Sequence, residues 1–535
     1  MAMPFRVLVT DEIDPDGVAL LAAEPLLDIH EVATLPKDEL LSQIGEYDAI
    51  IGRSATRISP ELLRAASRLK VVGRAGVGVD NIAMDVATEL GIAVVNAPAG
   101  NTIAVAELFF GVLLGILRQL PKSDASMRGG RWDRSQLMGT ELQGKTLGIV
   151  GLGRIGSAIA TRAAAFGMNL VAYDPYIVES RFQALRVQRV ADLGELLALA
   201  DVLTVHTPLT DETRGMIGRR QLAVLSPNAI VVNMARGGII DEVALTEALR
   251  AGQLRAAALD AFTKEPLAAD SPLRGIENLY LTPHIGASTT EAQRNVAVDA
   301  CAAVRDALIT GELSRSINIA EIGVARWQEL QPVLELTRKL AAISRALLAT
   351  HGSRVIDTID VRAGEAFSGS RAALLASAAV GILQSVTEQE RLNVINARTL
   401  AEARGIELSF TDLSSAASPH AIEVRVRSAM QEIGASGTAL PGSVPRITRI
   451  GAFHVDVQPR DTLLILTNND VPGVIGRVGT VLGEAEVNIA EYHQARLAQG
   501  GEALAAVALD GPISEATRAA LLELPDVRSA TVVTF

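Results

Sequence analysis

Two successive series of short apolar runs, each followed by a helical pattern of apolar and polar positions, occupy the first half of the chain. In the first series, up to about residue 98, the runs Val7–Val9, Ala49–Ile51, Val71–Val72 and Ala93–Val95 have the pattern of buried strands. This alternation of strand and helix is typical of a parallel sheet with helices on both faces. The segment 96–101, Asn-Ala-Pro-Ala-Gly-Asn, breaks the alternation and predicts a crossing between domains.

The second series begins at Gly144–Val150 and runs to about residue 283. Its later strands are expected at Leu170–Tyr173, Val202–Val205, Ala229–Val232 and Leu279–Leu281. We therefore predict an α/β protein with two doubly wound parallel-sheet domains.

The remaining chain has a different pattern. Residues 316–455 are rich in Ala, Ser and Arg, with helical stretches near Gln328–Leu348 and Ser370–Gln389. Strand-like patches at Val355–Val361 and Ala421–Val426 complete what we expect to be an α+β domain without a chemical motif of its own. From about residue 460 the pattern is βαββαβ, which predicts a small separate domain.

Composition and charge narrow the possible functions. At 535 residues the chain is too long for one hydrophobic core, and 49% hydrophobic with 21% charged residues is the balance of a globular protein. The net charge of −12 argues against a general nucleic-acid binder. The single cysteine, Cys301, excludes an internal disulfide and a multi-cysteine zinc site, and we predict no metal.

No segment predicts membrane association. The longest apolar run, Leu108–Leu117, is far shorter than the ~20 residues that cross a bilayer. The N-terminal residues lead directly into a strand-like segment, without the apolar core of a signal peptide. The expected location is therefore the cytoplasm.

A Gly-x-Gly-x-x-Gly motif at residues 151–156 follows an apolar strand and opens a helix. Gly151, Gly153 and Gly156 permit a tight turn and let backbone N–H groups approach a pyrophosphate at the helix N-terminus. Asp174 ends the next strand about 20 residues later, where it would bind the adenosine ribose hydroxyls. Because its charge would repel a 2′-phosphate, the sequence favours NAD over NADP.

Two further loops are expected beside the nicotinamide half of this cofactor. The first loop contains His206, Thr207 and Pro208, and the second contains Met234 and Ala235. His206 is a rival for the role of proton carrier, but its place at the end of a central strand beside a proline favours lining of the cofactor cleft.

Three residues after the glycine motif have the chemistry for oxidising a hydroxy acid. His284 follows Pro283, and histidine suits proton transfer because its unperturbed pKa of roughly 6.5 lies near working pH. Glu265 would hold the protonated ring and fix its tautomer. Arg236 would bind the substrate carboxylate with its planar fork and polarise the carbonyl.

With these residues in place, the first 315 or so residues resemble the D-2-hydroxyacid dehydrogenase family, whose histidine–glutamate pair and arginine match His284, Glu265 and Arg236. Longer segments at 52–56, 73–81, 235–242 and 283–292 resemble the D-3-phosphoglycerate dehydrogenase branch of that family. The C-terminal part resembles its long form, with an intervening domain and an ACT regulatory domain.

The resemblance implies a domain order and a reaction. Residues 1–98, completed by 287–315, would form a substrate domain around an inserted Rossmann NAD domain at 99–286. An intervening domain at 316–455, which resembles an allosteric substrate-binding domain, and an ACT domain at 460–535 would follow. The implied reaction is NAD-dependent oxidation of 3-phosphoglycerate to 3-phosphohydroxypyruvate, the first step of L-serine synthesis, in a homo-oligomer.

The resemblance also assigns site residues. Arg53, Ser54, Arg74 and Asn101 would bind the substrate, since a multiply anionic acid needs opposed cations. Arg131 and Arg134, on either side of Trp132, would lie on a dimer arm within reach of a neighbouring site. The residues expected around the cofactor are Val77, Gly151, Gly153, Arg154, Ile155, Gly156, Asp174, His206, Thr207, Pro208, Met234, Ala235, Arg236, Asp260, His284, Gly286 and Ala287.

L-Serine is the effector that the resemblance implies for the ACT domain. Asp470 could take its ammonium group, while Asn468 and Asn488 could bond both ends of the amino acid. ACT modules pair edge to edge and bind amino acids at the shared seam. The chain departs from family sites, which carry an aromatic residue or histidine at the position of Asn468.

Other readings share the same cofactor motif and histidine–glutamate pair. A glyoxylate/hydroxypyruvate reductase would usually lack the C-terminal extension, whereas a 2-oxoglutarate reductase could place its second carboxylate on the phosphate-binding arginines. A non-enzymatic NADH-sensing corepressor uses the same fold, but nothing in the sequence indicates a peptide groove or a nuclear signal.

Overall fold

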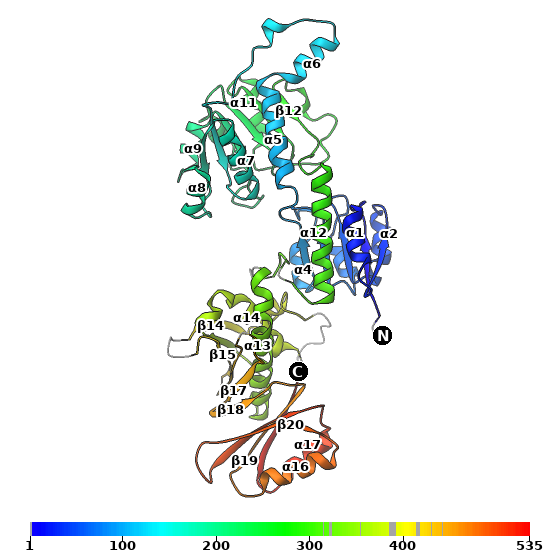
Figure 1. Ribbon diagram of the computed structural model, residues 1–535, viewed down its shortest axis with the longest axis vertical. Coiled ribbons are helices and arrows are strands. Elements are labelled where there is room, and N and C mark those ends of the chain that lie inside the picture. Colours follow the sequence, from blue (N-terminus) through cyan, green and yellow to red (C-terminus); the bar gives the residue numbers. More distant parts are fainter. Residues whose placement is uncertain are drawn as a thin grey trace.

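The protein is described by a computed structural model covering residues 3–313, 315–319, 324–353, 355–384, 392–413, 418–429, 431–440 and 442–535, with backbone alone at 324–328. In Figure 1 the molecule is elongated, with two parallel-sheet units in its upper part and the intervening and terminal units below them. The predicted α/β fold class with two doubly wound units is confirmed.

The N-terminal unit is a five-stranded parallel sheet in the order β2-β1-β3-β4-β5. Its strands are β1 (Phe5–Val9), β2 (Leu27–Glu31), β3 (Ala49–Gly52), β4 (Val71–Arg74) and β5 (Ala93–Asn96). Its helices are α1 (Pro15–Ala22), α2 (Lys37–Gln43), η1 (Ile44–Glu46), α3 (Pro60–Ala65) and α4 (Met84–Glu89). Because the strands are parallel, all their carboxyl ends open on one edge, and ligands of such sheets bind at that edge.

The second unit is a seven-stranded parallel sheet in the order β12-β11-β10-β9-β6-β7-β8, the doubly wound arrangement of dinucleotide-binding sheets with one further strand. Its strands are β6 (Thr146–Val150), β7 (Asn169–Tyr173), β8 (Gln188–Arg189), β9 (Val202–Val205), β10 (Ile230–Asn233), β11 (Ala256–Leu259) and β12 (Leu279–Leu281). Its helices are α5 (Thr102–Leu117), α6 (Leu120–Arg128), η2 (Arg134–Gln136), α7 (Arg154–Ala165), α8 (Glu179–Leu185), α9 (Leu193–Leu199), α10 (Arg219–Leu222), α11 (Glu242–Arg250) and η3 (Pro272–Gly275).

Helix α12 (Thr290–Ile309) carries the chain back to the N-terminal sheet. It begins where the Thr289 hydroxyl accepts a hydrogen bond from Ala292 N, a standard N-cap. A Cβ on Gly73 of β4 would lie 2.6 Å from Val304, so the helix can pack closely only against glycine there. Cys301 is buried in this contact, and burial raises the pKa of its thiol to about 12. The two sheets are therefore joined by this helix as well as by the 96–101 crossing.

The intervening unit is a mixed six-stranded sheet in the order β14-β13-β15-β16-β17-β18. The predicted helical stretch Ser370–Gln389 appears as α14 over Arg371–Leu383, and its residues 385–389 lie outside the described residues. The helices are α13 (Val324–Thr350), η4 (Glu365–Ser370), α14 and α15 (Ala397–Ala403). The strands are β13 (Thr358–Ala363), β14 (Glu407–Asp412), β15 (Ala421–Ser428), β16 (Gln431–Thr438), β17 (Arg446–Ile450) and β18 (Phe453–Val457).

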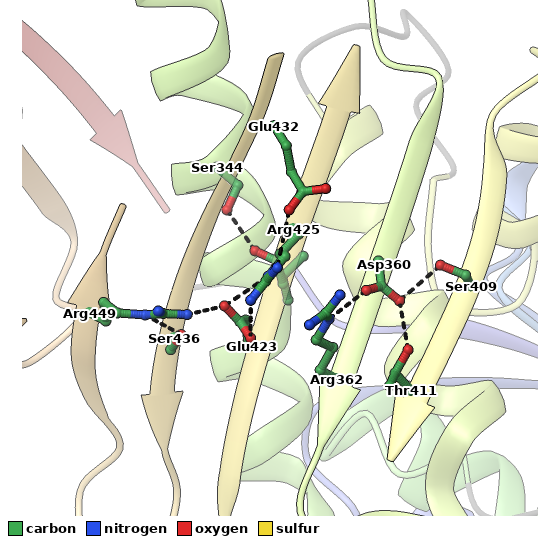
Figure 2. A network of polar contacts seen from close by, with 11 residues as sticks. Ser344, Asp360, Arg362, Ser409, Thr411, Glu423, Arg425, Glu432, Ser436 and Arg449 are labelled. Carbon is green, nitrogen blue, oxygen red and sulfur yellow. Dashed lines mark hydrogen bonds and ion pairs between the residues drawn. The ribbon is translucent and has the colours of Figure 1, made fainter. Parts of the chain in front are cut away.

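The two faces of this mixed sheet differ in chemistry. Ile422, Val424 and Val426 of β15 are buried in the core that includes α13 and α14. The alternate residues project from the opposite face, where Glu423 pairs with Arg425 and Arg449. Figure 2 shows two groups of polar contacts, one around Glu423 of β15 and one in which Asp360 of β13 bonds Arg362 of its own strand and Ser409 and Thr411 of β14. One stretch of the described chain, Glu365–Leu383, is long and apolar enough to cross a membrane, but 72% of its most apolar window is buried inside the folded protein.

The terminal unit is an antiparallel four-stranded sheet in the order β20-β21-β19-β22. Its elements are β19 (Thr462–Asn469), α16 (Val474–Glu484), β20 (Ile489–Arg496), β21 (Glu502–Leu509), α17 (Glu515–Leu522) and β22 (Val527–Thr534). One face packs under its own helices. The other face, including Leu463, Leu504 and Val533, belongs to the same core as the intervening unit, so these two units share one hydrophobic core.

Candidate active site

The glycine motif adopts the backbone that its sequence requires. Gly151 has φ +93°, and a Cβ there would lie 2.7 Å from the His206 carbonyl oxygen. A Cβ on Gly156 would lie 2.2 Å from the Gly151 carbonyl oxygen. Gly153 caps α7 and has open space where a side chain would stand. The first helix turn, with Arg154 and Ile155, therefore offers free backbone N–H groups to an anion.

Asp174 directly follows β7 and is tied to this loop. Its Oδ2 accepts a hydrogen bond from Leu152 N at 2.8 Å, and its Oδ1 accepts one from Tyr176 N at 3.0 Å. A carboxylate oxygen has room for more than one donor, so both oxygens can still accept from ribose hydroxyls. The residues present thus fit a dinucleotide without a 2′-phosphate.

His206 lies at the end of β9 beside the glycine loop. Its Nε2 is 2.8 Å from the Thr204 hydroxyl, while its Nδ1 is buried without a partner among the described residues. Burial lowers the pKa of His206 to about 3, so the ring is neutral at any working pH. A histidine that does not gain a proton in this range is a poor proton carrier, which supports its predicted place in the cofactor cleft.

The loop after β10 holds Arg236 through two sets of contacts. Asn233 accepts from Ala235 N at 3.0 Å and donates to the Arg236 carbonyl at 2.8 Å, which fixes the turn. The Arg236 side chain donates from Nε to Asp80 Oδ2 at 2.9 Å and from Nη1 to the Ala235 carbonyl at 2.7 Å. Asp80 belongs to the N-terminal unit, so this ion pair crosses from one unit to the other. Met234, between Asn233 and Ala235, is buried.

Glu265 and His284 form a hydrogen-bonded pair in which Oε2 lies 2.7 Å from Nδ1. Glu265 is oriented by Phe262 N, which donates to its Oε1 at 2.9 Å, and it precedes a cis proline. His284 has φ +54°, a left-handed conformation. Its Nε2 has no hydrogen-bond partner within the described part of the chain, and it is the ring atom that can exchange a proton with a ligand.

Asp260 stabilises the turn that carries His284. It is 1% exposed, and its two oxygens accept from Thr282 Oγ1, Ile285 N and Gly286 N at 2.6 to 2.8 Å. Asp260 was predicted to touch the cofactor, and the structure places its carboxylate against this turn. Ala287 accepts at its carbonyl from Gln293 Nε2 at 2.6 Å.

The predicted substrate residues lie on the edge of the N-terminal sheet. Arg53 and Ser54 follow β3, and Arg74 ends β4. Arg74 donates to the Ala75 carbonyl at 2.7 Å. Burial, followed by repulsion from Arg53 and Arg236, lowers the pKa of Arg74 to about 10. The guanidinium groups of Arg53 and Arg236, one from each unit, therefore both lie near enough to Arg74 to oppose its charge.

Several buried polar atoms around this cleft have no hydrogen-bond partner among the described residues. A buried polar group without a partner is costly, so such atoms are candidates for contact with a polar ligand or water. These atoms are Arg74 Nε, Asn101 Oδ1, Thr102 Oγ1, His206 Nδ1 and Thr207 Oγ1. They come from both units, and four of the five residues were predicted for the cofactor or the substrate.

Other predicted residues lie at the margins of the cleft. Val77 accepts at its carbonyl from Asn96 Nδ2 at 2.6 Å, and Pro208 is exposed after His206 and Thr207. Arg131 donates to Asp133 at 3.0 Å, next to Trp132, which is 78% exposed. The segment with Arg134 follows α6 and extends away from the rest of its unit at the top of Figure 1.

The predicted effector residues are not all brought together within one chain. Asn468 is buried, with Oδ1 unpartnered among the described residues, and Asp470 accepts from Arg496 and Gly500 N. These two donors hold the pKa of Asp470 below its usual value, the Gly500 contact more than the Arg496 contact. Asn488 donates to Asp510 at the opposite end of β21, roughly 20 Å away at about 3.3 Å per strand residue.

Comparison with known proteins identifies the family of the chain. Residues 110–286 match the NAD-binding domain of D-isomer-specific 2-hydroxyacid dehydrogenases, and residues 329–451 match the D-3-phosphoglycerate dehydrogenase intervening domain. D-3-phosphoglycerate dehydrogenase of Synechocystis is 38% identical over 99% of this chain and 94% of its own. That of Methanocaldococcus jannaschii is also 38% identical, over 99% of both chains. The chain belongs to the D-3-phosphoglycerate dehydrogenase family.

The solved structures that are similar to this chain cover about the length of its first two units. The TT0316 protein of Thermus thermophilus is 36% identical, with a TM-score of 0.54, over 58% of this chain and 100% of its own. D-lactate dehydrogenase of Aquifex aeolicus, solved with NAD and lactic acid, is 28% identical with a TM-score of 0.51, over 58% and 97%. The prediction of an NAD-binding unit is therefore confirmed.

Three residues of the family member's cleft were not predicted from sequence. Asp11 is the second residue after β1 and accepts from the backbone N of Arg53 and Thr56 at 2.8 and 2.9 Å. Burial opposes its charge, but hydrogen bonds from Thr56, Thr34 and Arg53 outweigh burial and keep the pKa of Asp11 below its usual value. Asp80 and Asn81 are the others. Asp11 could have been predicted, because polar residues close after a parallel strand often line a ligand site. Asp80 and Asn81 lie in a loop that has no such pattern in the sequence.

Proposed function

We propose that the chain oxidises 3-phospho-D-glycerate to 3-phosphohydroxypyruvate with NAD, the first step of L-serine synthesis. The observation that carries this proposal is the placement of Arg53 and Arg236 near the buried Arg74, since three cations brought together favour a ligand with several negative charges. The full-length relatives named D-3-phosphoglycerate dehydrogenase support it.

The protein's own groups supply the acid–base chemistry. When bound, NAD accepts the hydride at C4 of its nicotinamide. Arg236 binds the substrate carboxylate through the N–H groups that Asp80 and Ala235 leave free. His284 Nε2 takes the hydroxyl proton, while Glu265 holds Nδ1–H and stabilises the charge that the ring gains.

Initial rates with a panel of acids test the substrate. 3-Phosphoglycerate should be oxidised with NAD far more efficiently than D-glycerate or D-lactate, which lack the second anionic end. Equal efficiency with D-glycerate would exclude a phosphate site. Efficient reduction of 2-oxoglutarate would support the second candidate, because its distal carboxylate can bind the same arginines.

We also propose that the domains follow the boundaries inferred from the sequence, with residues 1–98 and 287–315 as one substrate domain. The packing of α12 on the N-terminal sheet supports this division. A cytoplasmic location, inferred from the sequence, stays a prediction.

L-Serine is proposed as a feedback inhibitor at the terminal unit. Asn468 and Asp470 lie at one end of its sheet and Asn488 at the other, so a site using all three requires a second chain. Allosteric coupling of this kind is typically worth about 1–3 kcal/mol. Inhibition by millimolar serine should weaken in both Asn468→Ala and Asn488→Ala. Mixed oligomers of the two variants should regain part of the serine inhibition, because one of the two sites between the paired chains then has both asparagines. Serine-insensitive wild-type enzyme would refute this proposal.

A further inference from the structure

One short segment of the N-terminal unit, residues 78–81, contacts an arginine-bearing loop of each unit. Asp80 accepts from Arg236 of the NAD-binding unit, 156 residues away in sequence. The next residue, Asn81, donates to the carbonyls of Arg53 and Thr56 at 3.0 and 2.7 Å. Two adjacent residues therefore bond the elements that carry the two opposed cations of the proposed substrate site.

The contacts of Arg236 orient its guanidinium group and leave part of it for a ligand. A guanidinium has five N–H donors, and here Nε is bonded to Asp80 and one Nη1 hydrogen to the Ala235 carbonyl. Three donors remain, one on Nη1 and two on Nη2, and a carboxylate can accept hydrogen bonds from them. Gly78 lies directly under the group, since a Cβ there would come within 1.9 Å of Nη2.

The Arg53 loop is fixed just as fully. Asp11 accepts from the backbone N of Arg53 and Thr56, and Asn81 donates both hydrogens of its amide to the carbonyls of the same two residues. The Asn81 carbonyl accepts from Ile58 N at 2.9 Å. The backbone of the loop is thus held from both sides, and this fixes the position of the Arg53 Cα from which the side chain extends.

We propose that Asp80 and Asn81 are positioning residues that set the separation between the carboxylate-binding and phosphate-binding arginines. This inference rests on the proposed function. Because the two residues are adjacent, one rigid segment holds both the Arg236 group and the Arg53 loop. Their positions are therefore not set by two independent domains. A substrate is then selected by the distance between its anionic ends, and small misplacements of such groups are costly to catalysis.

The two residues should affect different ends of the substrate. Asp80→Ala frees the Arg236 group and should weaken binding of the carboxylate, which phosphorylated and unphosphorylated ketoacids share. Asn81→Ala loosens the Arg53 loop and should weaken binding of the phosphate alone. Gly78→Ala is a second route to the first effect, because the added methyl must displace the Arg236 guanidinium.

The test is to measure KM and kcat for reduction of 3-phosphohydroxypyruvate and of hydroxypyruvate, with NADH affinity and Tm as checks. Asp80→Ala should raise KM for both ketoacids by about tenfold, and Asp80→Asn by less because its amide oxygen still accepts from Nε. Asn81→Ala should raise KM by about tenfold for the phosphorylated ketoacid only. Asp85→Asn, an exposed charge loss in the first turn of α4, is the matched control and should change neither.

The sign of the Asp80 effect separates positioning from charge. If Asp80 acted only through its negative charge, removing it would strengthen anion binding and lower KM. An unchanged or lowered KM in Asp80→Ala, or an equal effect of Asn81→Ala on both ketoacids, would overturn the inference. Wild-type enzyme that does not prefer the phosphorylated ketoacid would instead refute the proposed function.

Stabilisation by inorganic phosphate gives a readout that needs no turnover. It should raise Tm in the wild type and in Asp80→Ala but much less in Asn81→Ala. Equal Tm shifts in all three proteins would also overturn the inference.

Discussion

Glu265 Oε2 lies 2.7 Å from His284 Nδ1, so the carboxylate engages one ring nitrogen and leaves Nε2 as the nitrogen that can accept a proton. Residues 19 positions apart are joined here across the turn that Asp260 stabilises. The neutral ring of His206 lies at the end of β9, which β10 and β11 separate from β12 in the sheet, and it lacks such a carboxylate partner in the described contacts. The structure therefore distinguishes His284, which has a carboxylate partner, from His206, which contacts only a hydroxyl group among the described residues.

Replacing His284 by alanine should lower kcat by about 10²–10⁴-fold, the usual contribution of a positioned acid–base group. NADH affinity, measured by fluorescence titration, should stay nearly unchanged because the ring is not needed to hold the dinucleotide. Glu265→Gln keeps a hydrogen bond but loses the charge, so its kcat should fall less. His454→Ala, an exposed histidine of β18, is the control. Near-normal turnover in His284→Ala would show that another group carries the proton.

The buried ring of His206 should make stability depend on pH in a defined window. Its pKa of about 3 in the folded protein lies below the value of roughly 6.5 expected when unfolded, so unfolding takes up a proton between these values. The stabilising contribution is complete above pH 6.5 and is lost as pH falls toward 3. His206→Asn should therefore flatten the fall of Tm between about pH 6.5 and 4. A pH profile of Tm identical to that of the wild type would contradict this assignment.

Cofactor choice should follow from the charge of Asp174. A bare carboxylate at the ribose opposes a 2′-phosphate, and like charges in contact cost several kcal/mol, so kcat/KM for NAD should exceed that for NADP by at least about 100-fold. Asp174→Asn should lower the ratio of kcat/KM for NAD to kcat/KM for NADP. It should also lower kcat/KM for NAD, since the carboxylate accepts from Leu152 N in the glycine loop. Comparable efficiencies with the two cofactors in the wild type would overturn the assignment.

The arginines of the N-terminal unit should distinguish phosphorylated from unphosphorylated substrates. Arg53→Gln removes one charge-assisted contact, worth about 1.5–3 kcal/mol, so kcat/KM for 3-phosphoglycerate should fall by roughly 10- to 100-fold. Hydroxypyruvate, which has no phosphate, should be affected much less. Arg57→Gln, an exposed arginine four residues later, provides the comparison. A uniform loss on both substrates would place Arg53 outside the phosphate site.

Removal of the terminal unit should destabilise the intervening one. Leu463, Leu504 and Val533 are buried in the core that contains α13, so a chain ending near residue 459 would expose that apolar surface. Leu463→Ala in the full chain should lower the free energy of unfolding of these joined units by about 2–5 kcal/mol. Val471→Ala, at a 40% exposed position, should have little effect. An equally stable truncated protein would show that the shared core is dispensable.

Much of the fold was determined by local patterns in the sequence. Runs such as Val7–Val9 and Val202–Val205 became buried parallel strands, because a strand covered on both faces must be apolar throughout. Gly151 and Gly156 were identifiable because only glycine allows that turn and that approach of backbone to backbone. His284, Glu265 and Arg236 were nominated by their chemistry and order in the chain.

The tertiary structure decided which of these groups meet and what else holds them. Asp80 and Asn81 lie far in sequence from Arg236 and Arg53, so no local pattern could report their contacts. The low pKa of His206 follows from burial by segments that come together only in the folded chain. The separation of Asn488 from Asn468 depends on strand pairing in the terminal sheet. Sequence patterns record local conformation and burial, whereas distances between residues remote in the chain are set by packing.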